Sequence, residues 1–244
     1  MANASYWAKT RAPRHSLTFA LPLLLLYEAL AFLLSGDAMA GVRNGADVLL
    51  KSAFTALGGR NGLTVFGVVL MGVGAGLVIR DRRQNGPIEG RLFGGMLAES
   101  LVYAFVLGGV ASTVTSLLLG RLGFGLAVGG LAQFGFPTQI MISLGAGLYE
   151  ELVFRVLLVS GLAAGGRVLF GWKPVTSGVV ATIVGAVIFS GFHYIGPYGD
   201  PFKLDSFTFR AVAGLIFSGL YLSRGFGIAA WSHALYDVIL AVMK

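Results

Sequence analysis

Two carboxylates and a guanidinium interrupt an apolar stretch of the chain, LYEELVFRVLLVSGL at residues 148–162. Glu151 and Arg155 are four residues apart, a spacing that places both side chains on one face of a helix, where their charges can neutralise each other. Glu150 lies about 100° further round an α-helix and therefore needs a different partner. A carboxylate without a charged partner in apolar surroundings is suited to general acid or base chemistry.

Two histidines stand at helical spacing from other functional side chains. His193 follows Phe189 by four residues in FSGFH, and His233 precedes Asp237 by four residues in WSHALYD. The third histidine, His15, lies in the polar N-terminal tail. A glutamate, two histidines and an aspartate brought together from three helices would make a polar site that binds a metal or activates a water molecule.

Other ionisable residues in the apolar stretches are expected to serve the fold. Glu28 and Glu99 are isolated in sequence and are interpreted as polar contacts between helices. Arg210 lies near the start of an apolar run and is expected to extend outward to the membrane surface. The pair of Glu151 and Arg155 is compatible with either a structural or a functional role.

The composition places these residues in a lipid bilayer. Of 244 residues, 56% are hydrophobic and 12% are charged, and the mean hydropathy is +0.80, whereas a soluble domain has about 25% charged residues. The chain contains no cysteine, which excludes disulfides, thiolate zinc sites and a cysteine nucleophile. The net charge of +7 is attributed to loops near anionic lipid. No basic stripe or binding module indicates a nucleic-acid partner.

The elements that position these residues are predicted to be membrane helices. We expect an all-α, polytopic bundle of about seven spans, with a short interfacial or re-entrant helix at residues 45–59. The predicted spans are residues 16–34, 63–79, 92–119, 138–164, 175–192, 207–222 and 225–243. Residues 1–244 form one integral-membrane domain, and its motif-bearing core covers about residues 138–243.

Charge sets the expected orientation and location. With the N-terminus in the cytoplasm, most Lys and Arg residues of the loops fall on the cytoplasmic side, as the positive-inside rule requires. The run at 16–34 is interpreted as an uncleaved first span, because it is longer than a typical signal-peptide core and contains Glu28. A bacterial inner (plasma) membrane is the expected location.

Three motifs in order give the chain a family resemblance. EELVFR at 150–155, FSGFH at 189–193 and HALYD at 233–237 follow the pattern Glu-Glu-x-x-x-Arg, Phe-x-x-x-His and His-x-x-x-Asn/Asp. The chain thus resembles the CPBP family, the CAAX protease and bacteriocin-processing (Abi) membrane proteins, which includes the type II CAAX prenyl endopeptidases. The resemblance spans about residues 138–243, and residues 1–137 contain no assignable motif.

The resemblance implies roles for the motif residues. Glu150 is similar to the family's catalytic glutamate, which activates water, and His193 to the histidine that assists it. His233 and residue 237 are similar to the pair that stabilises the oxyanion. Asp237 is a departure, because an ionised aspartate cannot donate a hydrogen bond as asparagine can. It would instead orient His233, remain protonated or bind a metal. Glu151, Arg155 and Phe189 are expected to support the site.

The expected function is that of an intramembrane endopeptidase acting on a membrane-associated protein or peptide precursor. The favoured mechanism needs no cofactor, since no HExxH-type helix fixes metal ligands. Zinc bound by Glu150, His193, His233 and Asp237 is the alternative. A different class of function also fits a polar cavity, namely a transporter or a membrane immunity or binding protein. A transporter usually shows repeat symmetry, and none is visible in the sequence.

Overall fold

The computed structural model describes residues 5–35, 42–120 and 134–243. Residues 121–133, between the predicted spans 92–119 and 138–164, lie outside the described residues. The helical segments are α1 (Tyr6–Arg11), α2 (Pro13–Ser35), α3 (Gly45–Gly58), η1 (Gly59–Asn61), α4 (Gly62–Asn85), α5 (Arg91–Leu119), α6 (Phe136–Gly145), η3 (Ala146–Val159), α7 (Ser160–Phe170), α8 (Pro174–Phe192), α9 (Leu204–Arg224) and α10 (Phe226–Val242).

The prediction of an all-α membrane bundle is confirmed. Within the described residues, six helical stretches are long and apolar enough to cross a membrane: residues 13–34, 45–85, 91–119, 136–170, 174–192 and 204–224. The 17-residue helix α10 is apolar but shorter. Many large apolar side chains point outward, including Leu33, Val68, Phe105 and Val168. Such an exterior suits contact with lipid rather than with water.

The short helix expected at residues 45–59 is part of a longer bent element. Helix α3 passes through η1 directly into α4, and the two helices contact each other. At the bend, a Cβ atom on Gly62 would lie 2.4 Å from Cα of Thr55, so a larger residue would open the turn. One face of α3 packs against η3 and buries Asp47 and Lys51. Helix α3 therefore belongs to the bundle and approaches the motif-bearing helix.

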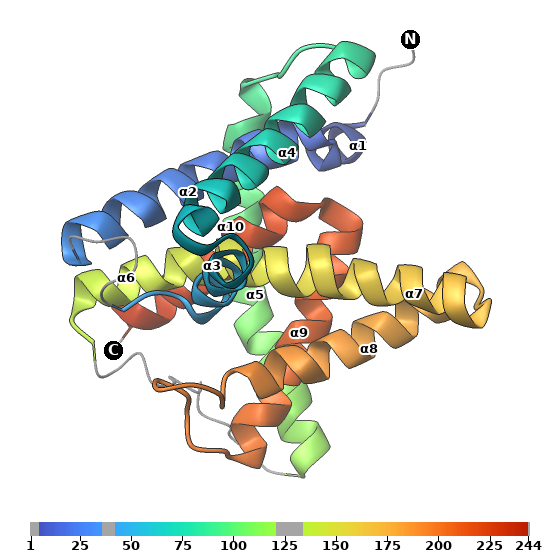
Figure 1. Ribbon diagram of the computed structural model, residues 1–244. Helices are drawn as coiled ribbons and strands as arrows, with labels where there is room; N and C mark the ends of the chain where they lie inside the picture. The colour runs from blue at the N-terminus through green and yellow to red at the C-terminus, as the bar shows by residue number, and fades with distance from the viewer. Residues whose placement is uncertain (1–4, 36–41, 121–133, 244) are drawn as a thin grey trace.

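Helix α10 occupies the centre of the molecule. It contacts α2, α5, α6, η3 and α9, and Figure 1 shows it behind the long helix formed by α6, η3 and α7. Its inner face consists mainly of small residues: Gly227, Ala229, Ala230, Ser232 and Ala234 are all buried. Small residues let membrane helices approach closely, which explains why this short helix is enclosed by so many neighbours.

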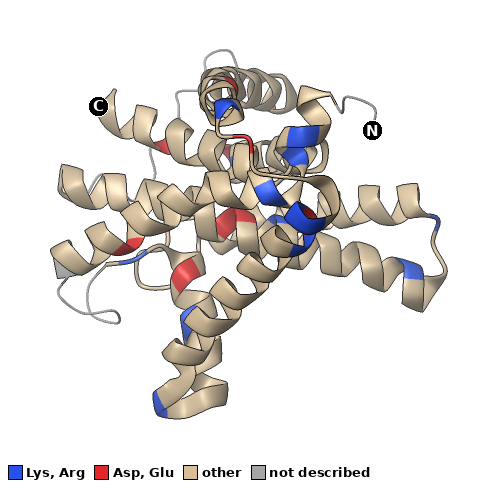
Figure 2. Cartoon of the chain, turned by 90° about the horizontal axis from the view of Figure 1, so that it is seen from above, with Lys and Arg blue, Asp and Glu red and all other residues tan. Residues whose placement is uncertain are grey.

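Ion pairs join distant helices inside the bundle, and Figure 2 shows charged residues near its middle as well as at helix ends. Glu28 on α2 is 3.0 Å from Lys51 and 3.2 Å from Arg43. Glu99 on α5 pairs with the fully buried Arg224 of α9 at 2.5 Å. The interpretation of Glu28 and Glu99 as contacts between helices is therefore confirmed. A charge within a membrane helix is expensive, and these pairs reduce that cost.

The expectation that Arg210 extends outward to the surface is wrong. Its guanidinium forms an ion pair with Asp200 and lies 5.2 Å from the ring centre of Tyr194. The backbone N–H of Asp200 in turn donates to the carbonyl of His193 at 2.9 Å. Arg210 thus holds the loop after α8, because that loop provides a carboxylate and an aromatic face within reach of the guanidinium.

Candidate active site

Three helices supply the motif residues. Glu150, Glu151 and Arg155 lie on η3, His193 directly follows α8, and His233 and Asp237 lie on α10. Segment η3 is wound as a π-helix: the N–H of Ser160 donates to the carbonyl of Arg155, five residues earlier. Regular α-helical winding was expected for this segment. Single π-turns occur frequently at functional sites.

A close approach of η3 and α10 brings the motifs together. A Cβ atom on Gly147 would lie 2.3 Å from the carbonyl oxygen of Ala230 and 2.6 Å from Cβ of Ala234. The absence of a side chain at 147 therefore allows the two backbones to touch one turn before the glutamates. As a result Glu150 and Glu151 face His233, which is more than 80 residues away in the sequence.

The two carboxylate oxygens of Glu150 have different partners. Oε1 accepts a hydrogen bond of 2.8 Å from the amide Nδ2 of Asn44. Oε2 lies 3.8 Å from Nε2 of His193 and 4.0 Å from Nε2 of His233, and it accepts no hydrogen bond within the described protein. The residue is 7% exposed. One oxygen is therefore anchored, while the other faces both imidazole rings.

Glu151 has two partners. Its Oε1 lies 2.8 Å from Nδ1 of His233 and 3.2 Å from Nη1 of Arg155. Glu151 and Arg155 therefore share one face of the helix, as their spacing predicts. The contact with His233 was not foreseen, because nothing in a single sequence indicates which helices pack together. Glu151 connects a helix-internal ion pair to a motif histidine.

The tautomers of both histidines follow from their partners. Nδ1 of His193 is 2.9 Å from the carbonyl oxygen of Phe189, and a carbonyl only accepts, so Nδ1 carries a proton. Nδ1 of His233 donates to the carboxylate of Glu151 for the same reason. In both neutral rings Nε2 is then a lone-pair acceptor, and both Nε2 atoms are directed toward Oε2 of Glu150.

Such a set of acceptors can hold a water molecule. Oε2 of Glu150 and Nε2 of His193 are too far apart for a direct hydrogen bond. A water between them would donate one hydrogen to each and keep its lone pairs for a nucleophilic attack. Burial would strengthen these contacts, because the local dielectric is low.

Asp237 stands on the far side of the His233 ring from Glu151. Its Oδ2 lies 3.7 Å from Nε2 of His233. The hydrogen bond at Nδ1 of His233 comes from Glu151, so Asp237 is not the partner of that nitrogen. The carboxyl group of Asp237 instead lies near the same nitrogen that faces Glu150.

Aromatic rings enclose the ionic groups. The guanidinium of Arg155 lies 4.3 Å from the ring centre of Phe189 and 5.4 Å from that of Phe217. Phe217 also stacks on His233, with ring centres 4.4 Å apart. Phe189 was expected to support the site, and it contacts both Arg155 and the edge of His193. Phe217 and Asn44 were missed, because neither belongs to a motif.

The four motif residues considered as zinc ligands are slightly too far apart. Adjacent ligand atoms of a tetrahedral zinc ion are separated by about 3.3 Å. Three of the corresponding separations are 3.7 Å for His233 and Asp237, 3.8 Å for His193 and Glu150, and 4.0 Å for His233 and Glu150. Among the described residues, no group of three His, Asp or Glu side chains is arranged to hold a metal ion.

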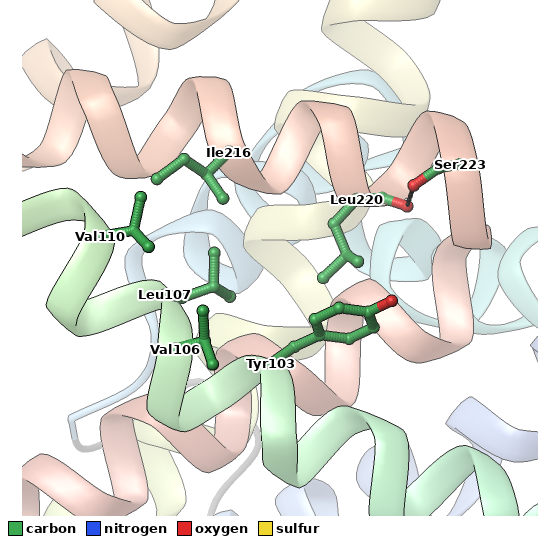
Figure 3. Close-up of a pocket in the computed structure, with 7 residues that line it drawn as sticks. All are labelled: Tyr103, Val106, Leu107, Val110, Ile216, Leu220 and Ser223. Carbon is green, nitrogen blue, oxygen red and sulfur yellow. Dashed lines mark hydrogen bonds between the residues drawn. The ribbon is translucent and has the colours of Figure 1, made fainter. Parts of the chain in front are cut away.

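A separate apolar pocket lies between α5 and α9 (Figure 3). Its volume is about 220 Å³. It is lined by Tyr103, Val106, Leu107, Val110, Ile216, Leu220 and Ser223. None of these residues belongs to the cluster around Glu150, so this pocket lies apart from the motif residues.

One comparison with known proteins produced a match. A family model described as type II CAAX prenyl endopeptidase Rce1-like matches residues 132–239. The matched residues include all three motifs. No curated protein matches the chain. No solved structure matches it either.

Proposed function

We propose a specific peptidase reaction on the premise that residues 132–239 form a domain of the type II CAAX prenyl endopeptidase Rce1-like family. This is the family that the resemblance implied. The family is one of proteases, and the helices are those of a multi-pass membrane protein. We propose that the chain hydrolyses a peptide bond of a membrane-associated protein or peptide through a water activated by Glu150. This proposal depends on one observation: Oε2 of Glu150 and Nε2 of His193 face each other at a distance of 3.8 Å.

The proposed reaction proceeds in two steps. Water held between Glu150 and His193 loses a proton to the carboxylate of Glu150, and the resulting hydroxide attacks the carbonyl carbon of the substrate. The carbon–nitrogen bond of the tetrahedral intermediate then breaks. The proton on Glu150 passes to the leaving amine, so the carboxylate is regenerated and one water molecule is consumed.

His233 is the proposed partner of the developing oxyanion. In its protonated form Nε2 can donate to an oxygen that gains negative charge. Glu151 at Nδ1 and Asp237 near Nε2 balance the positive charge of such an imidazolium. Asp237 therefore acts in this proposal through His233, without donating to the oxyanion itself.

We propose that water activation requires no bound metal. The ligand separations, which slightly exceed those of a tetrahedral zinc site, and the anchoring of Glu150 by Asn44 support this version. If zinc were bound, Glu150, His193, His233 and Asp237 would be its ligands and would have to move closer together. The ion would then supply a Lewis acid for the substrate carbonyl.

Substrate and location are proposed at the level of chemistry. Because the site lies within a membrane bundle, the substrate would be a chain held at the membrane by a lipid or by an apolar segment. A prenylated C-terminal sequence, such as the family name describes, is one such chain. From the distribution of Lys and Arg we propose a cytoplasmic N-terminus and a bacterial inner membrane.

The test compares protein termini in membranes containing the wild-type protein or its Glu150→Gln variant, by mass spectrometry. Glu89→Gln is a matched control, since Glu89 lies in the loop before α5 and pairs with Lys9 and Arg91. We expect particular new C-termini in wild-type and Glu89→Gln membranes and their loss in Glu150→Gln membranes. Equal terminus profiles at equal protein levels would refute the peptidase and favour a transporter or binding protein that uses the same polar cluster.

A further inference from the structure

A residue from the first half of the chain completes the cluster around Glu150. We propose that Asn44 is a positioning residue for Glu150, which aims one carboxylate oxygen at the two histidines. Asn44 lies outside the matched residues 132–239 and outside every motif. The inference rests on the proposed peptidase function and deepens it.

The contact is direct and buried. Nδ2 of Asn44 donates to Oε1 of Glu150 at 2.8 Å, across 106 residues of sequence. Asn44 is 3% exposed and Glu150 is 7% exposed. Hydrogen bonds to a charged group are about twice as strong as neutral ones, and burial protects this bond from competition with water. The amide is therefore a strong constraint on the carboxylate.

The orientation of the Asn44 amide is determined by its surroundings. Its Oδ1 accepts the backbone N–H of Ala46 at 2.9 Å and thereby caps the N-terminus of α3. Because Oδ1 is used in this way, the NH₂ group must face Glu150. The backbone N–H of Asn44 is 3.3 Å from the hydroxyl of Tyr27, which itself donates to Asp47 at 2.7 Å. Asn44 is thus held at three atoms.

This arrangement decides which oxygen of Glu150 can react. With Oε1 held by Asn44, rotation of the carboxylate would break a buried hydrogen bond. Oε2 therefore stays toward Nε2 of His193 and of His233. Removal of the amide would let the carboxylate rotate, and it would also remove a donor that stabilises the charged form of Glu150.

Other ionisable groups around Glu150 must be considered in a pH experiment. His193 faces it from the end of α8 and His233 from α10, with Asp237 beyond. The positive charge of Arg155, which lies on η3 like Glu150, also interacts electrostatically with Glu150. Asn44→Ser leaves all of these groups in place and adds no ionisable group, so a change in its pH profile can be assigned to the altered contact with Glu150.

Two substitutions separate the amide from the helix cap. Asn44→Ser and Asn44→Asp both keep an oxygen that can cap α3, and both remove the N–H donor to Glu150. Asn44→Asp also places a second negative charge against Glu150. The matched control is Asn85→Asp, because Nδ2 of Asn85 likewise donates to a carboxylate, that of Asp81 at 2.7 Å, but lies at the exposed end of α4.

The expected results concern kcat and the pH profile of peptide cleavage. For Asn44→Ser we expect kcat to fall about 10- to 100-fold with little change in KM, the effect of losing one charge-assisted hydrogen bond. For Asn44→Asp we expect a larger fall and a shift of the acid limb of the pH–rate profile to higher pH. Asn85→Asp should keep the wild-type profile. An unchanged acid limb in Asn44→Asp, with wild-type kcat, would overturn the inference.

A second readout does not depend on catalysis. Infrared difference spectra between each protein and its Glu150→Gln derivative isolate the bands of Glu150. We expect these bands to shift in Asn44→Ser relative to wild type. A shift in a protein that cleaves nothing would support the role of Asn44 and refute the peptidase, whereas cleavage by wild type with no band shift would refute the role of Asn44 alone.

Discussion

Nδ1 of His233 lies 2.8 Å from Oε1 of Glu151, and the same oxygen lies 3.2 Å from Nη1 of Arg155. The carboxylate of Glu151 therefore contacts a cation on its own helix and a histidine on another helix. The bond at Nδ1 places the ring proton of neutral His233 on that nitrogen. It also holds the ring in the orientation in which Nε2 faces Glu150. The second glutamate of the motif is a positioning group in this arrangement, and not only a partner for arginine.

Glu151→Gln is expected to lower both stability and activity. The substitution leaves Arg155, which is 1% exposed, without a carboxylate partner. Loss of one partner of a buried ion pair costs about 3–5 kcal/mol, so thermal unfolding in detergent should begin at a clearly lower temperature. The double variant Glu151→Gln/Arg155→Met should recover stability but not activity. Full activity of the double variant would contradict the role of Glu151 toward His233.

His193→Gln should reduce kcat strongly while the protein remains folded. A positioned acid or base contributes about 10²- to 10⁴-fold, and the glutamine removes the ring nitrogen that faces Glu150. His15→Gln is the comparison, since His15 is a buried histidine that accepts from the backbone of Glu89, away from the motifs. Cleavage of a peptide substrate in detergent measures both. Equal rates for the two variants would remove His193 from the mechanism.

Chelators should leave the activity unchanged if the proposed metal-free reaction is correct. We expect no loss after treatment with EDTA or phenanthroline and no stoichiometric zinc in the active purified protein by elemental analysis. Loss of activity that is restored by added zinc would instead establish the four-ligand site of Glu150, His193, His233 and Asp237. Such a result would also require these side chains to come closer than the 3.7–4.0 Å found here.

Arg224→Ala should affect stability without changing the chemistry. Arg224 is fully buried, pairs with Glu99 and donates to Oγ1 of Thr10 at 2.9 Å, which ties α9 to α5 and α1. Its removal leaves Glu99 without its cation and is expected to cost about 3–5 kcal/mol. The kcat of the folded fraction should equal that of wild type. A large fall in kcat at unchanged thermal stability would show a functional link that the structure does not predict.

The sequence by itself determined the properties that depend on composition and on short spacing. Apolar runs interrupted by few charges are sufficient to identify membrane helices, because lipid tolerates few alternatives. Residues four apart on a helix must share a face, which correctly related Glu151 to Arg155 and His233 to Asp237. The motif order also indicated the family, since it reflects residue types rather than their packing.

Only the tertiary structure decided which groups meet across helices. The approach of η3 and α10 at Gly147 joins Glu151 to His233, and the start of α3 brings Asn44 to Glu150. The fold also directs Arg210 to Asp200 in the loop after α8. The physical reason is that spacing fixes the direction of a side chain only within its own helix. Contacts between helices depend on backbone approach and packing, which a single sequence does not encode in any local pattern.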